Sequence, residues 1–188
     1  MPYFFRNSLI GLLLVFISAT GCKCQRDADA VVTMSNGQLC FSYPQDKEIR
    51  KRPYLFYDLV VSKVNSQDGE EWYIETISLD RKGLREPNSP ETCIKYGIIN
   101  PGIKVRKTAE PLQVDTAYRV SIDVSTASAS TPGYVYERRY RSDFCLSRNA
   151  KGETILVGAD WDDKTGAMIC LKPGESPKRS FWQKLFGK

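Results

Sequence analysis

Residues 118–124 read YRVSIDV, and apolar side chains occupy every second position of this stretch. The apolar members are Tyr118, Val120, Ile122 and Val124, and the residues between them are polar. Side chains two residues apart point to the same face of a β-strand. The stretch therefore predicts a strand with one buried face and one face in water.

The same period of two recurs elsewhere in the chain. It is found in residues 55–61, 71–79 and 134–144. In the first of these runs Leu55, Tyr57, Leu59 and Val61 are expected on one face, and in the last run Tyr134, Tyr136, Tyr140 and Phe144.

Residues typical of tight turns separate these runs. Asn36-Gly37 lies between two apolar runs and suits a two-residue hairpin, and residues 162–166 have the composition of another hairpin turn. About nine strands are expected, with no helical period sustained over a dozen residues. The pattern predicts an all-β fold, a single immunoglobulin-like antiparallel β-sandwich over residues 30–173.

The N-terminus has the layout of a lipoprotein signal peptide. Arg6 precedes a short apolar run from Leu9 to Ile17, and the small residues 18–21 follow it. The run is about half the length that a membrane-spanning helix needs, which argues against a permanent transmembrane anchor.

Cys22 directly follows these small residues, so that residues 19–22 resemble a lipobox. We expect cleavage after Gly21, lipidation of Cys22 and a tether over residues 22–29; an ordinary signal peptide with a chance cysteine is the alternative. Two or three acyl chains anchor a protein stably where a single chain does not. Lys23, rather than Asp, follows the cysteine, which implies the periplasmic side of a bacterial outer membrane, in its inner leaflet.

Four of the remaining cysteines lie in apolar strings that we expect to be strands: Cys40, Cys93, Cys145 and Cys170. In an oxidising compartment they predict two disulfides, and three pairings are open. Their spacings match no zinc motif. Cys24 lies in the polar leader and is left without an assigned partner.

Composition argues against several functions. The chain has no histidine, which removes the commonest general base and metal ligand. The carboxylate groups at 70–71 and 160–163 are expected in solvated turns. Residues 160–166 resemble a calcium loop, but Lys164 and Leu171 stand where oxygen ligands are required, so no metal or other cofactor is expected. No enzymatic activity is predicted.

Without residues 1–21 the chain has 26 Lys plus Arg against 22 Asp plus Glu, a net charge of +4 that is too even for a nucleic-acid-binding protein. The basic string 47–52 is expected in a solvated loop, with contact to an acidic partner or an anionic lipid as the alternative. Trp161 could supply an aromatic contact, whereas Tyr134 and Tyr136 are expected in the core.

The tail, residues 174–188, contains a short amphipathic stretch. If this stretch is helical, its apolar side chains share one face and its lysines lie elsewhere, which suits contact with a membrane or a partner. A frayed tail is the alternative, since the stretch is only one to two turns long. The candidate contact residues are Phe181, Trp182, Lys184, Leu185 and Phe186.

Four strings of this chain resemble a family of small bacterial lipoproteins described as type VI secretion immunity proteins of the periplasm. The strings are NGQLCF at 36–41, ETCI at 91–94, PLQVDTAYRV at 111–120 and RYRSDFCL at 139–146. The likeness extends from about residue 30 to residue 172. It implies a disulfide between Cys40 and Cys93, which leaves Cys145 to pair with Cys170.

This resemblance implies a membrane-anchored immunity protein that binds and neutralises a protein toxin through a complementary surface, in which the toxin's patch could be acidic. Two alternatives remain. One is an accessory lipoprotein of a secretion or assembly machine, and the other is an inhibitor of a cell-wall-degrading enzyme. The oligomeric state is not predicted.

Overall fold

The computed structural model describes residues 28–44, 54–66, 69–76, 86–126 and 136–176. These residues form β-strands and connecting turns without a helix, so the all-β prediction is confirmed. The strands are β1 (Ala28–Asp29), β2 (Val31–Ser35), β3 (Gln38–Ser42), β4 (Tyr54–Lys63), β5 (Glu70–Thr76), β6 (Ile94–Lys95), β7 (Ile103–Lys107), β8 (Ala117–Thr126), β9 (Tyr136–Arg148), β10 (Thr154–Asp162) and β11 (Ala167–Cys170).

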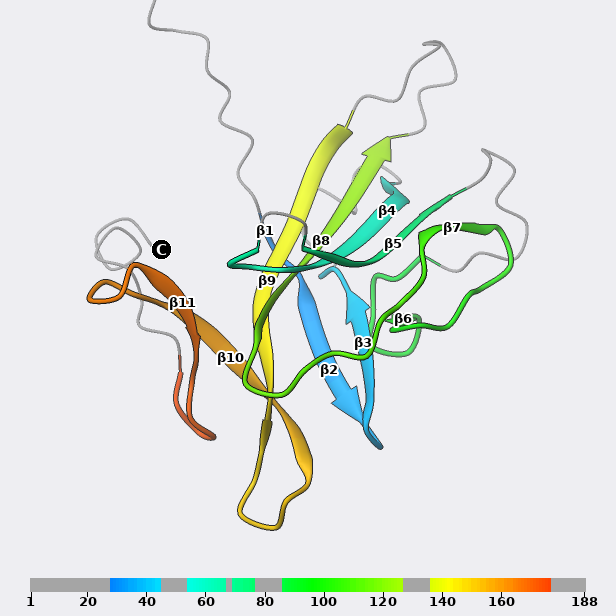
Figure 1. Ribbon diagram of the computed structural model, residues 1–188. Coiled ribbons are helices and arrows are strands. Elements are labelled where there is room, and N and C mark those ends of the chain that lie inside the picture. The colour runs from blue at the N-terminus through cyan, green and yellow to red at the C-terminus, as the bar shows by residue number, and fades with distance from the viewer. Residues whose placement is uncertain (1–27, 45–53, 67–68, 77–85, 127–135, 177–188) are drawn as a thin grey trace, which may run out of the picture.

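The strands form two sheets that pack face to face (Figure 1). The larger sheet has eight strands in the order β11-β10-β9-β8-β4-β5-β7, with β1 paired to β9 in parallel, and the smaller has the order β2-β3-β6. This is a β-sandwich. An immunoglobulin constant domain divides its strands four and three, so the immunoglobulin-like arrangement in particular is not confirmed.

The core lies between the sheets and is rich in aromatic side chains. The stretch 118–124 forms most of β8, and Tyr118, Val120, Ile122 and Val124 are all buried in this core, as their alternation predicts. Phe41 of β3 enters the core from the smaller sheet.

The β2–β3 hairpin confirms the role predicted for Asn36-Gly37. Both residues have positive φ, 50° and 75°, which a type I′ turn requires and which Asn and Gly tolerate. The hairpin places Leu39, Cys40 and Phe41 in consecutive pairs with β2.

Strand β4 departs from the predicted alternation. The register of β4 on β8 shifts between Phe56 and Asp58, which pair with the consecutive residues Val124 and Asp123. This β-bulge at Tyr57 moves the preceding residues to the other face. Phe56, rather than Leu55 and Tyr57, therefore lies in the core with Leu59 and Val61.

Strand β10 changes partners along its length. Residues 154–158 pair with β9, whereas residues 159–162 pair with β11. The β10–β11 hairpin covers a second, small apolar cluster around Cys145, Val157 and Ala159. The turn at 162–166 is a hairpin turn as predicted, because Gly166 N donates to Asp162 O at 2.8 Å.

Two disulfides brace these elements, Cys40–Cys93 and Cys145–Cys170, in the pairing that the family resemblance implies. The first joins β3 to the turn just before β6, since β6 begins at Ile94. Cys93 was expected inside a strand, and that expectation is wrong. The second joins β9 to the end of β11.

Removal of the Cys145–Cys170 disulfide is expected to lower the free energy of unfolding. The bond closes a loop with a sequence separation of 25, for which chain entropy predicts about 3.5 kcal/mol. Urea unfolding of the Cys145→Ser/Cys170→Ser variant, compared with the parent chain, measures the loss. An unchanged unfolding midpoint would show that the β10–β11 hairpin holds its position without the bond.

Candidate functional site

Four large hydrophobic side chains are exposed in the described part of the chain. They are Ile98 (44% exposed), Ile99 (57%), Trp161 (53%) and Ile169 (44%). Ile98 and Ile99 are adjacent in sequence and form one apolar tip. In the β10–β11 hairpin Trp161 pairs with Met168 and Asp160 pairs with Ile169, so Trp161 and Ile169 face opposite sides. The loop between β6 and β7 presents the two adjacent isoleucines.

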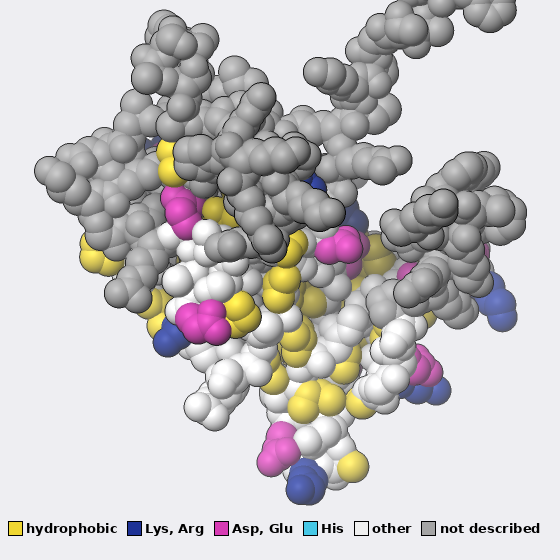
Figure 2. All heavy atoms as spheres, turned by 180° about the vertical axis from the view of Figure 1, so that it is seen from behind, with side chains coloured by type: hydrophobic (Ala, Val, Ile, Leu, Met, Phe, Trp, Pro, Cys, Tyr) yellow, Lys and Arg dark blue, Asp and Glu magenta, His cyan; other side chains and the backbone are white. Residues whose placement is uncertain are grey.

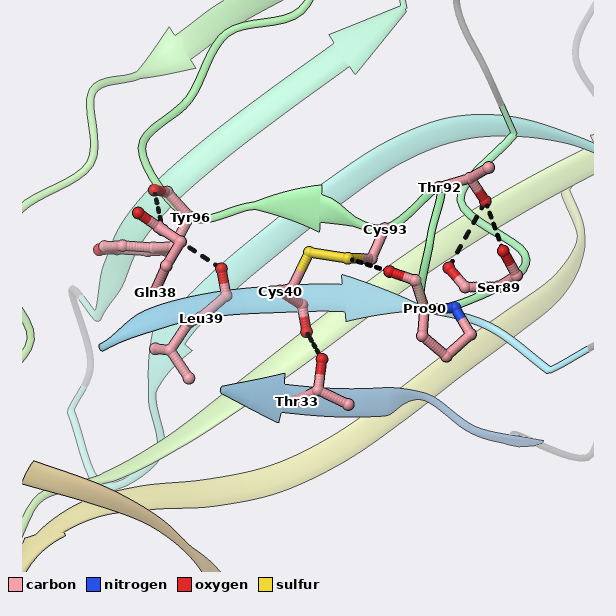
Figure 3. The surroundings of a disulfide bond; sticks show 9 residues. All are labelled: Thr33, Gln38, Leu39, Cys40, Ser89, Pro90, Thr92, Cys93 and Tyr96. Atoms are coloured by element: carbon pink, nitrogen blue, oxygen red, sulfur yellow. Dashed lines mark hydrogen bonds between the residues drawn. A yellow bond between two sulfur atoms is a disulfide. The ribbon is translucent and has the colours of Figure 1, made fainter. Parts of the chain in front are cut away.

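The loop begins at a covalent bond. Cys93 is bonded to Cys40 of β3, and the next two residues form β6, which pairs with β3 (Figure 3). Ile94 opposes Phe41, and Lys95 opposes Cys40. The chain is thus fixed to the smaller sheet three residues before Ile98.

Tyr96 continues this attachment through its backbone. Its N–H donates to Leu39 O at 3.0 Å, and its carbonyl accepts from Gln38 Nε2 at 3.0 Å (Figure 3). Within the loop, Ile98 N donates to Lys95 O at 3.1 Å, and Ile103 N donates to Asn100 O at 3.3 Å, just as β7 begins. Both ends of the loop are therefore held by hydrogen bonds.

The ring of Tyr96 anchors the loop to the core. It packs edge-on against Trp72, with ring centroids 5.1 Å apart, and against Phe41 at 6.3 Å. Its hydroxyl donates to Glu110 O at 2.6 Å. Burial raises the pKa of Tyr96 above its ordinary value, so the phenol stays protonated and keeps donating this bond.

A groove of about 270 Å³ lies beside Tyr96. The groove is smaller than the range typical of small-molecule sites, and its size suits one protruding side chain of a partner better. Its lining is mostly apolar and includes Met34, Leu39, Tyr96, Pro111, Leu112 and Leu146.

Basic side chains flank the loop on β7. Lys104 and Arg106 are each 47% exposed and share one carboxylate, that of Glu75, at 3.8 and 2.6 Å. Lys107 lies 3.5 Å from Glu110 and also donates to the carbonyl of Glu70. We call residues 95–107, with this apolar tip and basic strand, the 95–107 surface.

The outer face of the larger sheet carries a second notable arrangement. Five charged residues oppose one another in register across β9, β8, β4, β5 and β7: Arg139, Asp123, Asp58, Glu75 and Lys104. Arg139 forms two hydrogen bonds of 2.6 Å with Asp123 at one end of the row. Three carboxylates therefore lie side by side in the middle.

The carboxylates in this row are less exposed than the sequence predicts. Asp58 is 7% exposed and Asp123 4%, although alternation places Asp123 on a face expected in water. Burial, and next to it the negative charge of Asp123, raise the pKa of Asp58 to about 7; Arg139 opposes this rise, and Glu75 adds to it. Asp58 is thus about half protonated near neutral pH.

On the face of the molecule seen in Figure 2, basic and acidic side chains are interspersed rather than gathered by sign. Hydrophobic side chains form a band between them. This mixed distribution fits contact with a protein better than contact with a uniformly charged polymer.

Several predicted site residues fall outside the described ranges. They include Gly21 and Cys22 at the expected cleavage and lipidation site, Cys24, the basic string 47–52, Tyr134, and the tail residues Phe181, Trp182, Lys184, Leu185 and Phe186. The expected tether, residues 22–29, is described only at its end, where Ala28–Asp29 form β1.

Ile98, Ile99 and Asp58 were not identified as notable residues from the sequence. Ile98 and Ile99 break the alternating pattern, because they are adjacent and lie between Gly97 and the turn residues Asn100-Pro101-Gly102. An apolar pair inside a turn is a signal that could have been noticed. Asp58 gave no such signal, since its burial depends on pairing with β5 and β8.

Within the described residues no group of three or more His, Cys, Asp or Glu side chains could hold a metal ion. The same part of the chain contains no helix of the length and hydropathy needed to cross a membrane.

Comparison with known proteins found no relative of this chain. No protein-family model, no curated protein and no solved structure matches the chain.

The raised pKa of Asp58 predicts a stability that depends on pH. The folded state holds this proton more tightly than the unfolded state, so stability falls as the pH rises from about 4 to above 7. Asp58→Asn removes the ionisation and is expected to raise the free energy of unfolding at pH 8 by about 1–2 kcal/mol, with little gain at pH 4.

Urea unfolding of both chains at several pH values measures this difference. Ser121→Asn on the adjacent strand adds the same side chain without removing a carboxylate and serves as the control. A parent chain and an Asp58→Asn chain with parallel pH profiles would contradict the assignment to Asp58.

Proposed function

We propose that this protein is a lipid-anchored binding protein of the bacterial envelope, and that its partner is a protein toxin delivered by type VI secretion. The observation that carries the proposal is the rigid presentation of Ile98 and Ile99. A loop held by a disulfide and by Tyr96 keeps Ile98 44% and Ile99 57% exposed to water. Exposed apolar groups on a preorganised scaffold are typical of recognition surfaces.

The N-terminal sequence supports an anchored location. Cys22 is the proposed lipidation site, and β1 begins at Ala28, so only five residues separate them. Six Cα–Cα steps of at most about 3.3–3.6 Å each keep the start of β1 within about 22 Å of Cys22. A protein placed there meets a toxin as it enters the periplasm.

The disulfides support the same location. Cys40–Cys93 and Cys145–Cys170 are expected to persist in an oxidising compartment. Cys40–Cys93 also fixes the start of the loop that presents Ile98 and Ile99, which reduces the ordering cost of association. Immunity by surface complementarity requires no bond chemistry from this chain.

Survival under attack tests the proposal. Target cells that produce the full chain are mixed with a closely related attacker, and survivors are counted. We expect at least a tenfold gain in survival over target cells that lack the chain. The Cys22→Ser chain is expected to lose both this gain and its incorporation of labelled palmitate.

An attacker without a functional type VI secretion system is the control, and against it the chain is expected to make no difference. Equal survival of producing and non-producing cells under active attack would contradict the immunity proposal and favour an accessory lipoprotein. Inhibition of a resident wall-degrading enzyme by the purified chain would instead favour the inhibitor alternative.

A further inference from the structure

We propose that the 95–107 surface is the toxin-binding surface, and that it takes an acidic protein patch with a protruding apolar side chain at its centre. This inference rests on the proposed function and adds the place of contact and the chemistry of the partner. It combines the exposed isoleucines, the adjacent groove and the charge of the segment.

The apolar part of the surface has a bulge and a hollow. Ile98 and Ile99 project from the loop, and the groove of about 270 Å³ beside Tyr96 lies two residues away along the chain. A projecting apolar pair that is linked through Tyr96 to a hollow of side-chain size suits a partner with the complementary relief. A fluid lipid surface has no such relief, so the groove favours a protein over an anionic membrane as the occupant.

The charge of the segment selects an acidic partner. Residues 95–107 contain four cations and no carboxylate: Lys95, Lys104, Arg106 and Lys107. The two carboxylates that pair with β7, Glu75 and Glu110, are shared among three of these cations. The charge of Glu71 also acts on Tyr96 of this segment. Four cations against these three carboxylates leave a surplus of one positive charge, which carboxylates on a partner would complement.

The backbone of the loop is also preorganised for binding. Its backbone is fixed at Cys93, Tyr96 and Ile103 before any partner arrives. Binding therefore orders few groups beyond the side chains of the two isoleucines and the lysines, which leaves more of the contact energy for affinity.

The test uses the survival assay with the full chain and three variants. Ile98→Ser/Ile99→Ser removes the apolar tip, and Lys95→Glu reverses an exposed charge that has no ion pair among the described residues. Trp161→Ser removes an equally exposed hydrophobic side chain on β10 and is the matched control. Each variant's thermal unfolding is compared with that of the parent chain, so that loss of folding is recognised.

We expect the isoleucine and Lys95 variants to lose at least tenfold in protection at an unchanged unfolding temperature, while Trp161→Ser protects like the parent chain. Full protection by the folded isoleucine variant would overturn the inference and leave the immunity proposal intact. Failure of the parent chain itself to protect would overturn the immunity proposal, on which this inference depends.

Direct binding measurements test two other occupants of this surface, an anionic membrane and a second copy of the chain. Residues 25–188, which retain every described strand, are mixed with vesicles of phosphatidylglycerol or phosphatidylcholine and are also examined by size-exclusion chromatography. We expect no binding to either vesicle and no self-association that depends on Ile98 and Ile99. Isoleucine-dependent binding to phosphatidylglycerol, or an isoleucine-dependent dimer, would overturn the assignment to an acidic protein.

Discussion

The packing of Phe41 between the two sheets is the interaction on which the rest of the structure depends. Phe41 is fully buried, and its ring lies 5.8 Å from Phe144 of β9 and 6.5 Å from Trp72 of β5. The same ring contacts Tyr96 at 6.3 Å. The Phe41 side chain therefore connects the smaller sheet to β5 and β9 of the larger sheet and to the loop that follows β6. The smaller sheet is one hairpin with the two-residue strand β6 added, and an isolated hairpin is at best marginally stable in water, so this sheet needs such an attachment to bury its apolar face.

The position of the 95–107 surface follows from this cluster. Cys40 is next to Phe41 in β3, so the disulfide to Cys93 and the packing of Phe41 constrain neighbouring residues of one strand. Tyr96 belongs to the cluster, and Ile98 follows two residues later. The loop that exposes Ile98 and Ile99 is thus attached to the aromatic cluster of the core. This combination supports recognition by a preformed surface.

Much of the fold could be predicted from the sequence because, in these strands and turns, local residue preferences and tertiary packing favour the same structure. The alternation in 118–124 gives β8 its buried face, and Asn36-Gly37 gives the β2–β3 turn, since both depend on neighbouring residues only. The bulge at Tyr57 could not be predicted, because it arises from the register of β4 on β8. The burial of Asp58 depends on strands distant in sequence and was missed for the same reason.

The candidate site was less accessible to sequence reasoning than the fold. Cys22 and the C-terminal tail could be identified from the sequence because local sequence motifs define them. The 95–107 surface is defined instead by the side chains that remain exposed once the sheets have packed. Ile98 and Ile99 are ordinary core residues by type, and only the assembled sheets show that they stay 44% and 57% exposed. Exposure of this kind is a property of the tertiary structure.

The central claim is that the 95–107 loop is held in one conformation before any partner binds, and native-state hydrogen exchange tests this most directly. The amides of Tyr96 and Ile98 donate to Leu39 O and Lys95 O, so we expect both to exchange far more slowly than an unstructured peptide. In the Cys40→Ser/Cys93→Ser chain this protection should fall while the amides of β8 stay protected. Exchange of Tyr96 and Ile98 in the parent chain at the rate of an unstructured peptide would contradict the account.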